Sequence, residues 1–520
     1  MVIARPMGER AFLLELGSPA EVLALHRRLQ ATRPPGVVDL VPAAGTVLVR
    51  IDPAVISIEA ARAWAMSADA ETLPGPTRSM AVDLDITYDG ADLDETAALL
   101  GLSPDELVRR HTETEWTVAF TGFAPGFGYL VSPEWPFDVP RLPAPRTRVP
   151  AGAVGLAGVF SGAYPRETPG GWRLIGTTSA TLFDPGAADP ALLAPGTRVR
   201  FRPTVPATGA RGAGGGRSAG HRSAVERPLG DERPGLRVVE PGLLATVQDL
   251  GRPGAASLGV APSGAADRGA LRTANRLVGN SEGAAGIEVT MGGFRAVAEQ
   301  HLWVAVTGAW GPVHLGGREI DPYVAHEWMP GVELRLDWFT RGARAYVAAR
   351  GGIDAPGILG SRSTDTLAAL GRPALRAGDS LALADDQQGP VPPAPPVAWG
   401  PPPDDEITLD LADGPRVDWF TEDARAALFD AVWTVTNDAD RVGVRLDGPL
   451  LARSREGEIA SEGMVPGAVQ VPPSGQPTVL FADGPVTGGY PVIAVVTAAS
   501  LDLLAQARPG TLIRFRHARP

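Results

Sequence analysis

The chain has 520 residues, of which 44% are hydrophobic and 20% charged, and its formal net charge at pH 7 is −12. These are globular values for a chain longer than one ordinary domain, and such an acidic protein is a poor general binder of nucleic acid. The chain contains no cysteine and no lysine, which excludes disulfides, a thiol nucleophile, a P-loop lysine, a pyridoxal Schiff base and covalently attached biotin.

Charged residues interrupt the first apolar region of the chain, and a capped helix follows it. Because Arg5, Glu9 and Arg10 spoil a signal-peptide pattern, we expect a cytoplasmic protein, and the lack of any run of about 18 apolar residues argues against a membrane span. Ser18 and Ser103 are each followed by proline and, three residues later, by glutamate. Both patterns predict a helix that begins with a capping box.

The end of the second capped helix carries a candidate for acid–base chemistry. His111 is the best candidate general acid or base, because an imidazole titrates near neutral pH. The alternative is a histidine that only interacts with the carboxyl end of the helix dipole.

A strand predicted at residues 116–120 runs into the segment TGFAPGFGYL at 121–130, which is too rich in glycine and proline to continue it. Such a loop lets backbone N–H groups approach a ligand, and its aromatic side chains can line a flat substrate; the alternative is a tight turn packed under its own aromatics. An arginine such as Arg146 could hold a carboxylate or phosphate. The candidate substrate-binding residues of this half are Phe123, Pro125, Gly126, Phe127, Tyr129, Arg146, Tyr164, Gly170, Gly171 and Trp172.

Two segments read as connections between domains. Residues 204–234 are rich in glycine and arginine and predict a flexible linker, whereas the proline-rich residues 389–403 predict a stiff spacer. The overall content of 63 glycines and 51 prolines indicates many turns and a mainly β fold.

The second half offers a third helix and a strand with polar residues in apolar surroundings. Asp267 predicts the start of a helix that ends at Gly279. Asn275 lies beside the apolar face of this helix, as either a ligand contact or a satisfied core amide. Glu288 stands between two apolar residues, where burial could raise its pKa and make it an acid or base; the alternative is a solvent-facing position in an alternating strand.

An internal repeat links the two halves. Residues 149–202 and 471–516 share, in order, a Val-Pro strand start, a Gly-Gly-aromatic turn and a Pro-Gly-Thr turn, and both copies end in Arg-Phe-Arg. Three ordered matches favour two copies of one β module over chance similarity.

The segments HTETEWTVAFTGFAPGFGYL and TPGGWRLIGTT, within residues 111–178, resemble the B subunit of 5-oxoprolinase, also described as a Kip-type kinase inhibitor or allophanate hydrolase subunit 1. Residues 242–293, Arg350–Ile353, Leu359–Ser363 and 461–472 resemble its companion, the C subunit, and the pair is similar to the carboxyltransferase region of urea carboxylase. The resemblance implies a mainly β fold with some α, in which cyclophilin-like barrels are preceded by a small α/β domain. The expected boundaries are an α/β domain at 1–80, a barrel at 81–203, the linker at 204–234, and two pseudo-repeated lobes within 235–520.

The resemblance also implies site residues in the second half, which are Gln248, Asp249, Arg252, Ser263, Gly264, Asp267, Arg362, Ser461 and Glu462. It implies that the fused chain activates the lactam of 5-oxoproline with ATP and Mg²⁺, while a separate protein like the A subunit of 5-oxoprolinase completes hydrolysis. The alternatives are carboxyl transfer to urea or a related small amide, with a biotin carrier in trans, and restraint of a sensor histidine kinase. We expect no metal ligated by the protein itself. Whether the chain forms a homo-oligomer is left open by the sequence.

Overall fold

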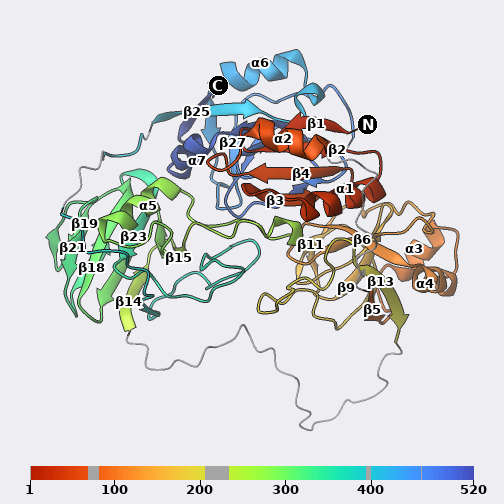
Figure 1. The fold of residues 1–520 in the computed structure, drawn as a ribbon, viewed down its shortest axis with the longest axis horizontal. Helices are drawn as coiled ribbons and strands as arrows, with labels where there is room; N and C mark the ends of the chain where they lie inside the picture. Colours follow the sequence, from red (N-terminus) through yellow and green to blue (C-terminus); the bar gives the residue numbers. More distant parts are fainter. Residues whose placement is uncertain are drawn as a thin grey trace, which may run out of the picture.

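The structure is a computed structural model that describes residues 2–67, 81–204, 234–393, 400–403, 405–457 and 459–519. The chain folds into an N-terminal domain (2–67), a first barrel (81–204), a middle lobe (234–393) and a second barrel (405–519), all visible in Figure 1. Nearly all of the predicted linker at 204–234, and residues 394–399 of the predicted spacer at 389–403, lie outside the described residues. No helix in the described ranges is long and apolar enough to span a membrane.

The N-terminal domain is a four-stranded sheet in the order β1-β2-β4-β3 with two helices packed on one face. The predicted cap is confirmed, because the Ser18 side chain accepts a hydrogen bond from the Glu21 backbone N–H at 3.3 Å. The elements are β1 Ile3–Pro6, β2 Ala11–Glu15, α1 Pro19–Ala31, β3 Val37–Pro42, β4 Thr46–Ile51 and α2 Ile58–Ser67.

The first barrel is a seven-stranded sheet in the order β12-β9-β10-β7-β6-β13-β5, and a bridge between Thr87 and Thr177 joins its two edges. Ser103 caps α4 as predicted. The elements are β5 Ala81–Ile86, α3 Leu93–Leu99, α4 Pro104–Glu113, β6 Trp116–Thr121, β7 Gly128–Val131, β8 Arg146–Val149, β9 Ala153–Ala157, β10 Phe160–Ala163, β11 Thr168–Gly170, β12 Arg173–Thr177 and β13 Arg198–Pro203.

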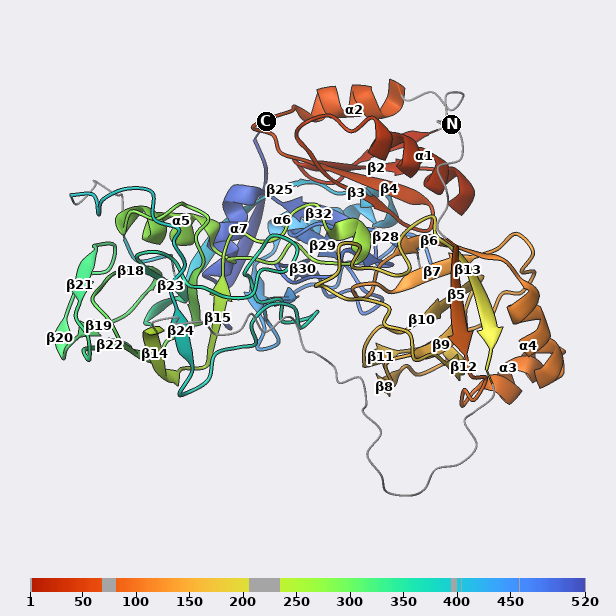
Figure 2. The same ribbon diagram turned by 60° about the horizontal axis from the view of Figure 1, so that its bottom comes forward.

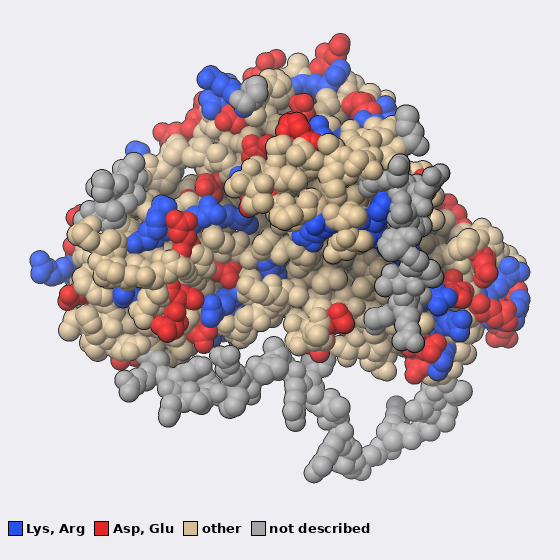
Figure 3. Space-filling model, viewed as in Figure 1, with Lys and Arg blue, Asp and Glu red and all other residues tan. Residues whose placement is uncertain are grey.

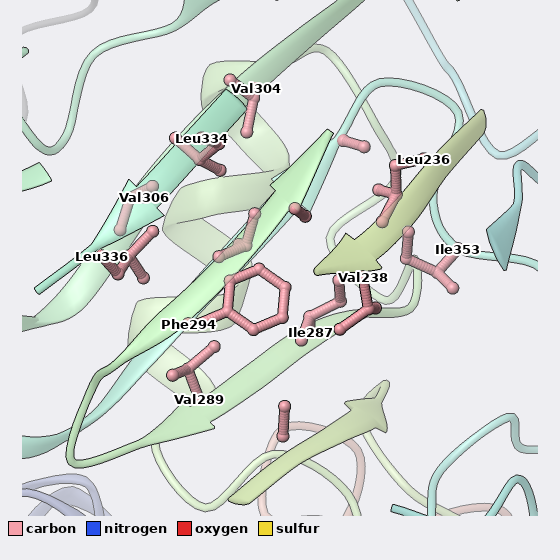
Figure 4. Close-up of a cluster of buried hydrophobic side chains, with 14 of the residues drawn as sticks. Leu236, Val238, Ile287, Val289, Phe294, Val304, Val306, Leu334, Leu336 and Ile353 are labelled. Atoms are coloured by element: carbon pink, nitrogen blue, oxygen red, sulfur yellow. The ribbon is translucent and has the colours of Figure 1, made fainter. Parts of the chain in front are cut away.

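The middle lobe packs a six-stranded sheet against a five-stranded one, and apolar side chains of both sheets meet in one core (Figure 4). Asp267 caps α5, and the predicted apolar face of this helix is buried. The elements are β14 Pro234–Pro241, β15 Leu244–Gln248, η1 Ala256–Leu258, α5 Arg268–Leu277, β16 Gly286–Thr290, β17 Phe294–Ala298, β18 Leu302–Trp310, β19 Val313–Leu315, β20 Arg318–Glu319, β21 His326–Trp328, β22 Glu333–Leu336, β23 Arg341–Ala349 and β24 Ser380–Ala382.

The second barrel is closed, with strand order β25-β32-β29-β30-β27-β26-β33, so the predicted mainly β fold with barrel modules is confirmed. Its elements are β25 Glu406–Asp413, η2 Val417–Trp419, α6 Glu422–Asp430, β26 Trp433–Val435, β27 Gly443–Asp447, β28 Glu462–Gly463, β29 Ala468–Gln470, β30 Thr478–Leu480, β31 Thr487–Gly488, β32 Val492–Val496, α7 Ala498–Ala505 and β33 Leu512–His517.

The two barrels repeat one another in register. In each, the last strand pairs in parallel with the first strand and antiparallel with the strand after the helix (β13 with β5 and β6, β33 with β25 and β26). In each, a buried tryptophan donates its indole N–H, at 3.1 Å, to a carbonyl five residues earlier: Trp116 to His111, and Trp433 to Leu428. The internal repeat read from the sequence therefore extends to the helix and strand before it, and His111 occupies the position of Leu428.

The free face of the N-terminal sheet packs on the second barrel, which lies more than 330 residues away in the sequence. Figure 2 shows the sheet between its own helices and this barrel. Leu13 and Leu48 share a buried apolar cluster with Met464 and Val495. The N-terminal domain also contacts the first barrel, through α1 and β3 against β6, and so bridges the two barrels.

Candidate active site at the junction of the two halves

The glycine-rich loop after β6 is where the first barrel meets the second half of the chain. The hydroxyl of Thr121 donates to the carbonyl of Ser257, and the Gly126 N–H donates to the carbonyl of Leu258 at 2.9 Å. A Cβ at Gly122 would lie 1.9 Å from the hydroxyl oxygen of Thr487, so only glycine allows this approach. The loop predicted to bind a ligand thus also forms the interface between the two halves.

Two residues of the loop line a small cavity of about 10 Å³ at this junction. Phe123 has a left-handed backbone with φ of +66° and is 41% exposed, whereas Pro125 is the second loop residue in the wall. The rest of the lining includes three charged side chains, Arg166, Asp365 and Asp483. The cavity has room for about one water, and charged groups from both halves of the chain surround it.

Asp365 is a buried carboxylate with an unused oxygen. Its side chain accepts the Ala368 N–H at 2.7 Å through Oδ1, while Oδ2 is buried and has no hydrogen-bond partner among the described residues. Burial, and secondly the charge of Asp483, raise the pKa of Asp365 to about 6. A carboxyl group that titrates near neutral pH beside a cavity is suited to proton transfer.

Arg252 supplies unused hydrogen-bond donors next to Asp365. It is 1% exposed, donates one N–H to the carbonyl of Ser363, and leaves Nε and Nη1 without a partner in the described structure. Burial lowers the pKa of Arg252, against the opposing effects of Asp365 and Asp249. Because a buried donor without an acceptor is costly, these atoms fit an anionic or carbonyl oxygen.

The loop around Ser363 is held by Asp249. This carboxylate accepts hydrogen bonds from the hydroxyls of Ser361 and Ser363 and from the Arg362 N–H, the last at 2.6 Å. Gln248 donates to Thr246 and to the backbone of the same loop. Both predicted residues are therefore brought to the junction, where they position the loop that carries Asp365.

A buried ion-pair network lies behind the cavity. Arg441 binds Glu288 at 2.5 Å, Asp483 at 2.9 Å, and the carbonyl of Gly264 at 2.7 Å. Ser263, also in a left-handed conformation, places its hydroxyl 2.6 Å from Asp483. The network joins the middle lobe to the second barrel, because Glu288 comes from β16 and Arg441 precedes β27.

The acid–base role predicted for Glu288 is wrong. Its oxygens accept from Arg441, from the Ala266 N–H at 2.9 Å and from the Tyr346 hydroxyl at 2.8 Å. The solvent-facing alternative is also wrong, since the side chain is 1% exposed. Glu288 is a fully engaged anchor for Arg441.

Asp267 serves mainly as a helix cap. It accepts the Ala270 N–H at 2.8 Å and the amide of Gln506 at 2.7 Å. Burial, and then the charge of Asp502, raise the pKa of Asp267 to about 7. It joins the network region through the Tyr346 hydroxyl, which accepts a hydrogen bond from the Asp267 N–H.

The structure places the other two predicted catalytic residues in hydrophobic cores, away from the junction. His111 is fully buried between Trp116, Trp135 and Phe201, and burial lowers its pKa to about 3, which favours a neutral core histidine over a general acid or base. Asn275 is the satisfied core amide of the two alternatives: its amide group donates to the carbonyl of Ala284 at 2.7 Å. Sequence alone could not separate these positions from a site, because both lie on amphipathic helices.

Most aromatic residues predicted to bind a substrate in the first barrel instead pack on one another, as in the alternative of a tight turn covered by its own aromatic side chains. Phe127, Tyr129, Tyr164 and Trp172 are buried and pack on one another edge to face. Gly170 lies against the Tyr164 hydroxyl, and its neighbour Gly171 lies next to Pro145. Only Phe123 and Pro125 of the predicted set, with the Gly126 backbone, reach the junction.

Four predicted residues are engaged elsewhere. Arg146 is paired with Asp92 at 2.6 Å, Glu462 is buried against Arg416, and Arg362 pairs with Asp354 and Asp386 of the middle lobe. Ser461 uses its carbonyl to accept the Ala44 N–H at 3.0 Å. The side chains of Arg146, Glu462 and Arg362 thus each take part in a structural ion pair. Ser461 helps to hold the N-terminal domain in place.

Sequence reasoning missed the four charged residues that matter most at the junction: Arg166, Asp365, Arg441 and Asp483. Asp365 lies two residues beyond the segment Leu359–Ser363 that resembles the C subunit, and Asp483 interrupts an apolar run. A single acidic residue in apolar surroundings was therefore the sequence feature that could have indicated Asp483. No group of three or more acidic, histidine or cysteine residues suited to a metal ion occurs in the described ranges.

Comparison with known proteins identifies the family. The model of the carboxyltransferase domain, subdomains A and B, matches residues 258–517, and the model of its subdomains C and D matches residues 2–193. The chain is 34% identical to the C subunit of 5-oxoprolinase from Escherichia coli (strain K12) over 285 residues, 54% of this chain and 90% of that protein. It is 40% identical to the B subunit of 5-oxoprolinase from Escherichia coli O157:H7 over 210 residues, 38% of this chain and 94% of that protein.

A solved structure covers both halves together. The crystal structure of TTHA0988 matches with a TM-score of 0.84 and 39% identity, over 98% of this chain and 99% of that chain. The order of the two family models along the chain agrees with the order of the matches to the B and C subunits. The chain therefore belongs to the carboxyltransferase-domain family that includes the B and C subunits of 5-oxoprolinase, with a B-like part and a C-like part in one polypeptide.

Proposed function

We propose that this chain is the fused B–C component of an ATP-dependent 5-oxoprolinase, which opens the lactam of 5-oxoproline to glutamate together with a separate A subunit. The two Escherichia coli relatives, a C and a B subunit of 5-oxoprolinase, are each covered over about nine tenths of their length. The observation that carries the proposal is the junction cavity, where the loop of the B-like part meets the neutral-range carboxyl of Asp365. Arg252, with its unpaired donors, lines a neighbouring small cavity behind it.

The chemistry of a lactam explains why such a junction is useful. An amide carbonyl is a poor electrophile, and donors aimed at its oxygen stabilise the charge that develops there. Arg252, with unpaired N–H groups, would supply such donors, and Asp365 would move a proton at the ring nitrogen or an attacking water. Because the junction cavity has room for about one water and both side chains are 1% exposed, the junction would have to open to admit the lactam. ATP would supply a phosphoryl group that turns the amide oxygen into a leaving group.

The direct test combines the purified chain with its candidate partner, the A subunit, together with ATP, Mg²⁺ and 5-oxoproline, and measures glutamate. We expect glutamate only when both proteins and ATP are present. Arg252→Gln should reduce the rate by about a hundredfold or more, while Arg362→Gln, whose side chain pairs with Asp354 and Asp386 instead, should stay within about twofold of the wild type. No glutamate from two folded partners would refute the assignment.

The description of the family as a carboxyltransferase domain favours one alternative, transfer of a carboxyl group to urea or a related amide. A chain without lysine cannot carry biotin itself, so this reaction needs a biotinylated carrier protein in trans. Carboxylation of urea by the chain with such a carrier, in the absence of glutamate formation, would favour this alternative.

A further inference from the structure

A second cavity, of about 340 Å³, lies where three parts of the chain meet. The N-terminal domain contributes Arg10 and Arg50, the middle lobe contributes Arg268 and Arg272 from α5, and the second barrel contributes the start of α7. Figure 3 shows basic side chains gathered on the face between α5 and the N-terminal sheet. Its volume falls in the range of small-molecule sites, and the cavity requires the B-like and C-like parts together.

The charge lining this cavity is unbalanced. Four arginines face two acids, Glu9 and Asp502, so the lining carries two more basic than acidic side chains. Three of the arginines have acidic neighbours: Arg50 pairs with Asp39, Arg10 lies 3.5 Å from Glu9, and Arg272 lies 3.7 Å from Glu282.

Arg268 is attracted by Asp502, but it differs from the other three because no hydrogen bond or ion pair engages its guanidinium in the described part of the chain. Burial, and then the charges of Arg50 and Arg272, lower its pKa to about 10. Gathering like charges around a half-buried guanidinium is unfavourable unless an anion lies among them. An arginine can hold a carboxylate or a phosphoryl group through two parallel hydrogen bonds.

Much of the remaining cavity wall is apolar. Met7, Phe481, Val495 and Leu501 belong to it, and Ala266 forms part of the boundary. The Ala266 N–H is bound to Glu288, so the ion-pair network of the junction lies directly behind this wall. The cavity therefore suits an oxyanion attached to a small body that is partly apolar.

We propose that this cavity binds a small organic anion whose carboxylate or phosphoryl group is held by Arg268, with Arg50 and Arg272 beside it. The site is separate from the junction cavity, because the segment Phe481–Asp483 stands between the two. The proposal concerns binding only, and it holds whether or not the chain takes part in lactam hydrolysis.

The test measures binding to the full chain by isothermal titration calorimetry at low salt. Two probes separate the two sources of an oxyanion: 5-oxoproline offers a carboxylate, and inorganic tripolyphosphate offers phosphoryl groups. We expect one of them to bind at one site per chain, with an affinity that falls as salt is added. Arg268→Gln should weaken this binding about tenfold or more.

Arg276→Gln is the matched control, because Arg276 lies on the same helix, is exposed and pairs with Glu282 at 3.0 Å. It should change the affinity by less than about twofold. Arg10→Gln, at an exposed position on the cavity rim, gives a second variant that should fold and should weaken binding as well. Failure of both probes to bind the wild type, or equal affinity in folded Arg268→Gln and wild type, would overturn the proposal.

Discussion

Burial disfavours the ionised form of Asp365, so the stability of the folded chain should fall as this carboxyl group loses its proton. Its pKa in the folded chain is about 6, above the ordinary value of 3.8. A group whose pKa rises on folding contributes stability that is complete below the unfolded value and is lost as the pH rises through the folded value. Ionised Asp365 therefore costs about 3 kcal/mol above pH 7.

Asp365→Asn should stabilise the protein and abolish its activity. The asparagine oxygen can still accept the Ala368 N–H, and its amide N–H₂ replaces the unpaired oxygen beside Asp483. We expect a higher melting temperature than wild type at pH 8, a smaller difference at pH 5, and glutamate formation reduced by at least about a hundredfold. Asp385→Asn, at an exposed aspartate, is the control; full activity of Asp365→Asn would exclude Asp365 from proton transfer.

His111 gives the opposite pH dependence. Its folded pKa of about 3 lies below the ordinary 6.5, so its contribution to stability is present above pH 6.5 and is lost as the pH falls. At pH 5 this loss is about 2 kcal/mol. Nδ1 of His111 lies 2.8 Å from the Tyr88 hydroxyl, and Nε2 lies 2.9 Å from the Ser161 hydroxyl. The imidazole itself is fully buried.

His111→Leu should therefore be tolerated, because the equivalent position in the second barrel is Leu428. We expect a loss of about 1–3 kcal/mol at pH 7.5, where the Ser161 hydroxyl loses its partner, and a smaller loss at pH 5. Denaturant unfolding at both pH values measures this difference. Glutamate formation by the folded variant should stay within about twofold of wild type; inactive but folded protein would restore a catalytic role to His111.

At the scale of elements, the two barrels keep one ion pair and reverse its charges. In the first barrel, the backbone N–H of Asp92 donates to the carbonyl of Leu174 in β12. In the second barrel, the backbone N–H of Arg416 donates to the carbonyl of Val492 in β32. The Asp92 side chain pairs with Arg146, which lies opposite Gly170 in the two-stranded sheet β8–β11. The Arg416 side chain pairs with Glu462, which lies opposite Gly488 in the equivalent sheet β28–β31. The pair is thus a part of the barrel architecture, which explains why Arg146 and Glu462 do not serve as ligands.

Arg416 also reaches the N-terminal domain, where it binds Glu15 at 2.5 Å. Arg416→Met would leave Glu462, whose pKa burial already raises, without a partner. Removing one member of a buried pair typically costs about 3–5 kcal/mol. We expect a clear drop in melting temperature, greater at pH 8 than at pH 5, whereas Arg425→Met on the outer helix should change it little. Equal effects of both variants would show that Arg416 is an ordinary surface charge.

The elements could be predicted well where a local rule decides them. The caps at Ser18, Ser103 and Asp267, and the repeated Gly-Gly and Pro-Gly-Thr turns, follow from side-chain and backbone chemistry within a few residues. The site could be predicted only in part, since a partner across the fold decides whether a polar residue is free. Glu288 is neutralised by Arg441, 153 positions away, and no local pattern reveals that contact.

On the scale of the whole molecule, the two halves are held together by direct packing. The N-terminal sheet buries Leu13, Leu48 and Val41 against the second barrel, and the loop after β6 binds the backbone near Ser257. The B and C subunits in Escherichia coli are separate proteins, each nearly fully covered by one half of this chain. The contacts between the halves should therefore persist without a covalent connection.

Expression of residues 1–204 and 234–520 as two polypeptides should yield a one-to-one complex on size-exclusion chromatography, with the glutamate-forming activity of the intact chain. Gly463 provides the decisive control, because a Cβ there would lie 2.5 Å from the Cβ of Leu48 in the N-terminal sheet. Gly463→Val should separate the two polypeptides, while Gly457→Val, at a glycine with no atom near its Cβ position, should leave them associated despite some backbone strain. Two polypeptides that fold but stay apart without any substitution would mean that the covalent connection, and not the buried faces, holds the junction and its charged cavity in place.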